Sequence, residues 1–66
     1  MQVYEALLSQ RDSVERVLAA QRIIAKLGGS IKLAPPTMTG LVLVTLLLPP
    51  NVRTGEVLPG LPFYPV

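Results

Sequence analysis

The chain contains neither cysteine nor histidine among its 66 residues. Without cysteine it has no disulfide and no thiolate ligand, and without histidine it lacks the commonest imidazole ligand for a metal. Its carboxylates are widely spaced in the sequence and number only four: Glu5, Asp12, Glu15 and Glu56. So few scattered carboxylates do not form an oxygen cage around a cation. The sequence therefore predicts no metal site and no cofactor.

Side chains suited to catalysis are scarce as well. Ser9, Ser13 and Ser30 are available as nucleophiles, but no histidine is present to activate them. Asp12 and Glu15 would share one face of a helix, where their spacing suits a cap or a surface pair better than a general acid and base. We therefore expect the chain not to be an enzyme, with no catalytic residue and no small-molecule substrate.

Charged residues are few and apolar residues abundant. Only 15% of the chain is charged and 50% is hydrophobic, whereas ordinary soluble domains are about 25% charged. A chain of this length buries only about 60% of the surface that its unfolded form exposes. Exposed apolar patches mark interfaces or membranes. With disulfides and metals excluded, oligomerisation or a partner is the remaining way to stabilise so short a chain.

The composition changes near Gly28–Ser30. Eight of the ten charged residues lie in residues 1–32, and all seven prolines lie in residues 33–66. This division predicts three segments of one structural unit: an amphipathic helix in residues 1–29, an apolar extended or β segment in residues 30–58, and a Pro-rich arm in residues 59–66.

The first segment is typical of a helix, because Gln2–Leu27 contains no glycine or proline and Gly28 follows as a natural end. At 100° per residue, eight apolar residues fall within a sector of about 120° that is suited to face a core: Val3, Ala6, Leu7, Val14, Val17, Leu18, Ile24 and Ala25. Gln10 and Gln21 lie in this stripe, either fixing the register of a helix–helix seam or bordering a partner. Asp12–Glu15 has capping-box spacing, so a new helix could begin there. The constant phase of the stripe favours one continuous helix.

The second segment alternates in polarity over residues 30–34, as a half-buried strand does. After two prolines, Leu41–Leu48 is apolar almost throughout, so a strand here would need cover on both faces. Whether residues 37–48 form a strand or a helix stays open. Glu56–Leu58 is predicted to pair back as a short further strand.

The last segment has proline at every third position from 59 to 65, which suits an extended arm. Phe63 and Tyr64 would anchor this arm in a groove of an adjacent subunit. The predicted fold class is therefore small α+β: an N-terminal amphipathic helix, then a β-hairpin or extended apolar segment, then a Pro-rich arm, with the core completed by other chains.

The leading functional hypothesis is a non-catalytic structural or accessory subunit of a larger protein assembly, by analogy a virion or a similar multi-subunit particle. It would contact copies of itself or other subunits. Nine residues are candidate partner contacts: Val14, Val17, Gln21, Ile24, Leu41, Leu43, Leu61, Phe63 and Tyr64.

Two alternatives follow from other features. A small membrane-associated subunit would place residues 37–48 in lipid, although as a helix this stretch is about 18 Å long against a hydrocarbon core of roughly 30 Å. A nucleic-acid-binding regulator would use Arg11, Arg22 and Lys26, a weaker positive field than such proteins usually carry. The beginning of the chain has no basic start and no long apolar stretch, so we expect a cytoplasmic or particle-associated protein and not a secreted one.

Overall fold

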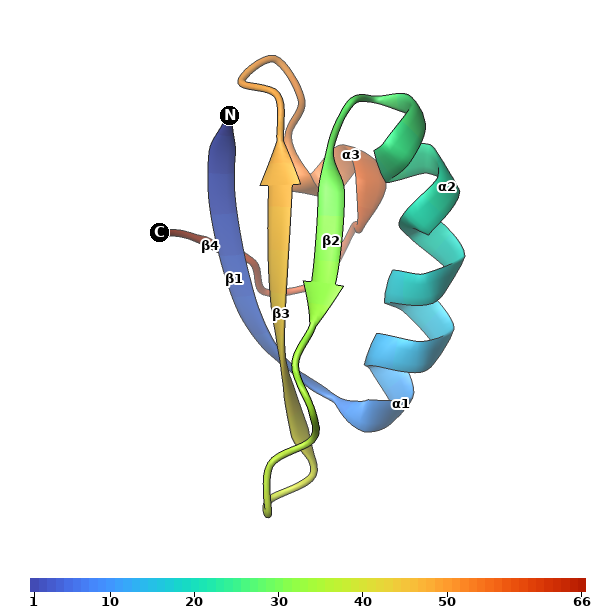
Figure 1. The fold of residues 1–66 in the computed structure, drawn as a ribbon, viewed down its shortest axis with the longest axis vertical. Helices are drawn as coiled ribbons and strands as arrows, with labels where there is room; N and C mark the ends of the chain where they lie inside the picture. Colours follow the sequence, from blue (N-terminus) through green and yellow to red (C-terminus); the bar gives the residue numbers. More distant parts are fainter.

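A computed structural model describes residues 1–66 as a four-stranded antiparallel sheet with helices on one side (Figure 1). The strands are β1 (Gln2–Ser9), β2 (Ser30–Leu33), β3 (Leu41–Leu48) and β4 (Tyr64–Pro65), and their order across the sheet is β2-β3-β1-β4. Between β1 and β2 run α1 (Gln10–Asp12), the π-helical turn η1 (Ser13–Val17) and α2 (Leu18–Lys26). We call these three pieces the long helix. A short helix, α3 (Thr54–Val57), precedes β4.

The long helix connects two strands that lie on opposite sides of β3. Because β3 is antiparallel to both β1 and β2, these two strands run in the same direction, and the unit is a split βαβ arrangement. In Figure 1 the long helix follows one side of the sheet, and the loop of residues 34–40 extends beyond the ends of β2 and β3. The register places Thr45 of β3 between Glu5 of β1 and Lys32 of β2.

The predicted N-terminal helix is wrong, because Gln2–Ser9 forms a strand and the helix lies in the middle of the chain. All eight residues of β1 pair with β3. Ala6 and Leu8 are buried, whereas Leu7 between them is exposed, which is the two-residue period of a strand. The segment contains no residue that forbids either structure, and pairing with β3 decides between them.

The long helix begins at Ser9, whose hydroxyl accepts a hydrogen bond from the Asp12 amide at 3.1 Å. The Ser13 hydroxyl donates to the Ser9 carbonyl at 2.9 Å. Asp12 therefore sits in the first turn, where a carboxylate favours the positive end of the helix dipole. The helix continues without a break at Asp12, passes through one wider π turn and ends before Gly28, whose φ of 84° suits a helix terminus.

Replacing Ser9 with alanine is expected to lower the free energy of unfolding by about 1 kcal/mol, because the Asp12 amide loses its side-chain acceptor. Replacing Ser9 with aspartate keeps an acceptor at the cap and should retain most of the stability. Urea denaturation followed by circular dichroism measures both variants. Equal stability of the alanine and aspartate variants would show that the cap contributes nothing.

Twelve buried apolar residues form the core between the sheet and the helices, all from this one chain. The strands contribute alternate residues, the long helix one stripe, and the region of α3 closes one end. The members are Ala6, Leu8, Val17, Ala20, Ile24, Val42, Val44, Leu46, Leu48, Val52, Val57 and Leu58. The prediction that other chains complete the core is therefore wrong, since the strand at residues 2–9 supplies the surface that seemed to be missing.

The helical stripe differs in phase from the predicted one. Its buried residues are Ser13, Val17, Ala20 and Ile24, whereas Val14, Leu18 and Ala25 are exposed. The predicted phase was fitted partly to residues 3, 6 and 7, which belong to β1. When these three residues are left out, the apolar stripe of the helix is centred on the residues that pack against the sheet.

The C-terminal third differs from the prediction in one element. Glu56–Leu58 was expected as a strand, but α3 ends at Val57, and the Glu56 carboxylate accepts a hydrogen bond from the Arg53 amide at 2.9 Å as a helix cap. The arm then runs to the free edge of β1, where β4 pairs with Tyr4 and Glu5. Proline is tolerated there because an edge strand need not donate on both sides.

Candidate interaction surface

The two faces of the sheet have different neighbours. Even-numbered residues of β1 and β3 point into the core beneath the helices, and odd-numbered residues point to the opposite side. We call this second side the open face. It consists of Val3, Glu5, Leu7, Ser30, Lys32, Leu41, Leu43, Thr45 and Leu47. The cover predicted for both faces of Leu41–Leu48 is present on one face only.

Apolar side chains on the open face form two groups, one toward each end of β1 and β3. The register pairs Leu7 with Leu43 and Val3 with Leu47, so neighbouring strands present their apolar side chains together. Leu7 is 57% exposed, and Leu43 and Leu47 are half-buried.

A row of three polar residues crosses the middle of this apolar surface. Lys32, Thr45 and Glu5 lie side by side on β2, β3 and β1. Adjacent strands are about 4.8 Å apart, which separates Lys32 from Glu5 by roughly 10 Å. Neither Lys32 nor Glu5 forms an ion pair within the chain. The sole ion pair joins Arg11 and Glu15 on the long helix at 3.4 Å.

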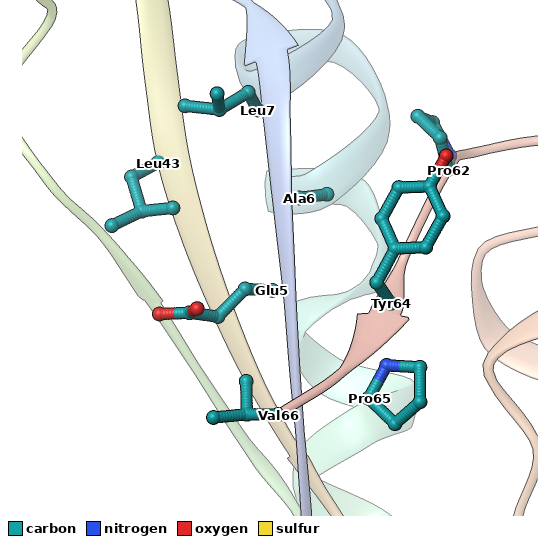
Figure 2. Close-up of a pocket in the computed structure, with 8 residues that line it drawn as sticks. All are labelled: Glu5, Ala6, Leu7, Leu43, Pro62, Tyr64, Pro65 and Val66. Carbon is teal, nitrogen blue, oxygen red and sulfur yellow. The ribbon is translucent and has the colours of Figure 1, made fainter.

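The C-terminal arm adds a hollow of about 510 Å³ next to the open face. Its walls are Glu5, Ala6, Leu7, Leu43, Pro62, Tyr64, Pro65 and Val66. Figure 2 shows Glu5, Leu7, Leu43 and Val66 pointing to one side of the sheet and Ala6 to the other. Glu5 contributes the only carboxylate side chain to this wall.

The four predicted contacts on the long helix divide into two groups. Val17 and Ile24 are fully buried in the core and leave no surface for a partner. Val14 and Gln21 are exposed, and Gln21 lines a hollow beside β2 with Ser30 and Ile31. Leu18 lies with them, so the helix carries a second, smaller set of exposed apolar residues.

The five predicted contacts in the second half lie near the sheet. Leu41 and Leu43 belong to the open face. Leu61 and Phe63 are half-buried and pack against the core of their own chain. Tyr64 is 68% exposed and lies in the wall of the hollow.

Sequence reasoning missed the contribution of β1 to this surface. Val3 and Leu7 were assigned to a helix, and Glu5 and Lys32 were treated only as charges. The alternation of Val3, Glu5 and Leu7 with buried neighbours was the available signal, but the same residues also satisfied a helical period.

The basic residues are spread over the helix and its neighbours. Arg11 pairs with Glu15, and Arg16 donates a hydrogen bond to the carbonyl of Pro59. Arg22 and Lys26 remain exposed on α2. No three carboxylates come together as a group that could hold a metal ion.

None of the helices is both long enough and apolar enough to span a bilayer. Searches against known protein families, curated proteins and solved structures found no match to this chain. The open face and the chemistry of its side chains are therefore the basis for inferring a function.

Proposed function

We propose that this chain is a non-catalytic structural or accessory subunit of a larger protein assembly, and that it acts through protein contacts of its open face. The observation that supports this most is the gathering of apolar side chains of β1 and β3 on the open face, over which no helix packs. Exposed apolar side chains that gather on one face, with polar residues among and around them, mark an interaction site.

The strand geometry makes this surface well suited to binding. β3 is hydrogen-bonded on both sides, to β1 and to β2, so its open-face side chains are held on a rigid support. A preorganised surface loses little conformational entropy when a partner binds. Removing apolar area from water contributes about 25 cal/mol per Å², and the exposed leucines therefore favour association.

The two alternative functions have less support. Residues 37–48 include the central strand, and moving this segment into lipid would break its pairing with β1 and β2 and open the core. A nucleic-acid site would rest on Arg22 and Lys26, since Arg11 and Arg16 are engaged with Glu15 and Pro59. These two cations on α2 give a weak field for binding a phosphate backbone.

The proposal is tested by placing a photo-cross-linking phenylalanine analogue at Leu43 or at Gln21 of the chain produced in its native cells. Leu43 reports on the open face, and Gln21 reports on the exposed side of the long helix. We expect an adduct of defined mass from position 43 and none from position 21. Circular dichroism confirms that both variants fold. An absence of adducts from position 43, or adducts from position 21 alone, would contradict a function of the open face.

A further inference from the structure

We propose that the occupant of the open face is a second copy of this chain, docked face to face about a two-fold axis that runs along β3 and passes over Thr45. This rests on the proposed function and names its partner. The observation behind it is the row of Lys32, Thr45 and Glu5, in which opposite charges lie at equal distances on either side of the central residue.

A two-fold axis along β3 exchanges the two sides of the sheet. The β2 strand of one copy then lies over the β1 strand of the other, and Lys32 meets Glu5 of the second copy twice by symmetry. Along β3, each residue meets its own equivalent, so Leu43 and Leu47 contact leucines. Sheets packed face to face are about 10 Å apart, a gap that extended lysine and glutamate side chains bridge from both sides.

The charges also discriminate between the two simple ways of stacking the faces. An axis perpendicular to the strands would place Glu5 on Glu5 and Lys32 on Lys32 of the second copy. Like charges opposed across an interface are strongly unfavourable, and they exclude that arrangement. The remaining arrangement is isologous and closed, so it gives a dimer and not a filament.

The carboxylate of Glu5 favours a second copy of the chain over a purely apolar partner. Glu5 is half-buried already and has no ion pair within its own chain. Covering it with apolar groups would desolvate a charge without compensation. A second copy places its unpaired Lys32 over Glu5, and it places the leucines of its β3 over the leucines of the first copy.

The first test is the mass of the full chain by light scattering behind a sizing column over a concentration series. β1 and β3 are each roughly 26 Å long and β2 is about half that length, so the interface is small and predicts weak association. The concentration series should therefore reach several hundred micromolar. We expect the mass to rise from 7.1 kDa toward twice that value. A mass of one chain throughout would overturn the dimer. The proposed function would survive that result if Leu43 cross-links to a protein of another mass.

The second test is charge reversal, with folding of each variant checked by circular dichroism. Glu5→Lys and Lys32→Glu each oppose like charges in the dimer and should raise its dissociation constant at least about tenfold. The double variant Glu5→Lys/Lys32→Glu restores opposite charges at both places and should return the dissociation constant to within about threefold of the original. Failure of the double variant to recover would overturn the proposed axis. The perpendicular axis opposes like charges in the original and in every variant, so it predicts no loss of affinity in the single variants.

The third test uses the absence of cysteine in the natural chain. Thr45→Cys places a unique thiol on the axis, where a short bis-maleimide should link two copies. Gln21→Cys places it on the exposed side of the long helix and serves as the matched control, with no linked dimer expected. Efficient linking through position 21 and not 45 would show that association uses the helix and would overturn the proposal.

Discussion

Replacing Ile24 with alanine is expected to lower the free energy of unfolding by about 2–5 kcal/mol. Ile24 is fully buried and is the last residue of the stripe by which the long helix packs on the sheet. A chain of this length has a total stability of only about 3–10 kcal/mol. The variant should therefore be largely unfolded at moderate temperature, which urea denaturation followed by circular dichroism would show.

The neighbouring residue provides a matched control. Ile23 is 54% exposed on the same helix, so Ile23→Ala removes the same atoms with little loss of packing. Alanine is a better helix former than isoleucine, so the free energy of unfolding of the Ile23→Ala variant should stay within about 0.5 kcal/mol of the original. Equal losses from the two substitutions would mean that the helix packs on the sheet in a different phase.

Replacing Gly29 with alanine is expected to have the second largest effect, a loss of about 2–3 kcal/mol. A Cβ atom at this position would overlap the carbonyl oxygen of Leu47 and lie 3.2 Å from Ile24 Cγ2 and 3.3 Å from Leu48 Cδ2. The carbonyl belongs to the backbone of the central strand and cannot retreat without disturbing its pairing with β2. The melting temperature followed by circular dichroism measures the loss.

Gly55→Ala is the control for this substitution. Gly55 lies in α3, and a Cβ atom there meets nothing within 4 Å. Removing the flexibility of glycine in a helix should stabilise the chain by about 0.4–1 kcal/mol. The two variants therefore differ in sign, and a Gly29→Ala protein as stable as the original would refute the close approach of the helix end to β3.

Local signals were sufficient to predict the parts of the fold that are stabilised locally. The end of the long helix at Gly28 and the strand near residues 30–34 agree with the structure, since glycine, proline and alternation act over short distances. The apolar run at residues 41–48 left strand and helix open, and it forms β3. Gln2–Ser9 carries no such signal. Its conformation is set by β3, which lies in the other half of the chain, so no window around residues 2–9 contains the deciding information.

The candidate surface was predictable to the same extent. The two-sided apolar character of Leu41–Leu48 predicted that a strand here would need cover on both faces, and Leu41 and Leu43 lie on the face over which no helix packs. The positions of Glu5 and Lys32 depend on the register of β1 and β2 against Thr45, which is a property of the assembled sheet. Charge complementarity of this kind becomes visible only after the strands are paired.

The strand order also affects how the protein is made. β1 is synthesised first, but both of its neighbours, β3 and β4, come from later parts of the chain. The long helix and the β2–β3 hairpin join segments that are close in sequence, so they form at a small entropic cost. Pairing of β1 with β3 and β4 closes much longer loops and is therefore slower. Until β1 docks, β3 has a bare apolar edge of the kind that recruits other strands. During synthesis, the interval between the appearance of β3 and its pairing with β1 is therefore the time when this edge is open to strands of other chains.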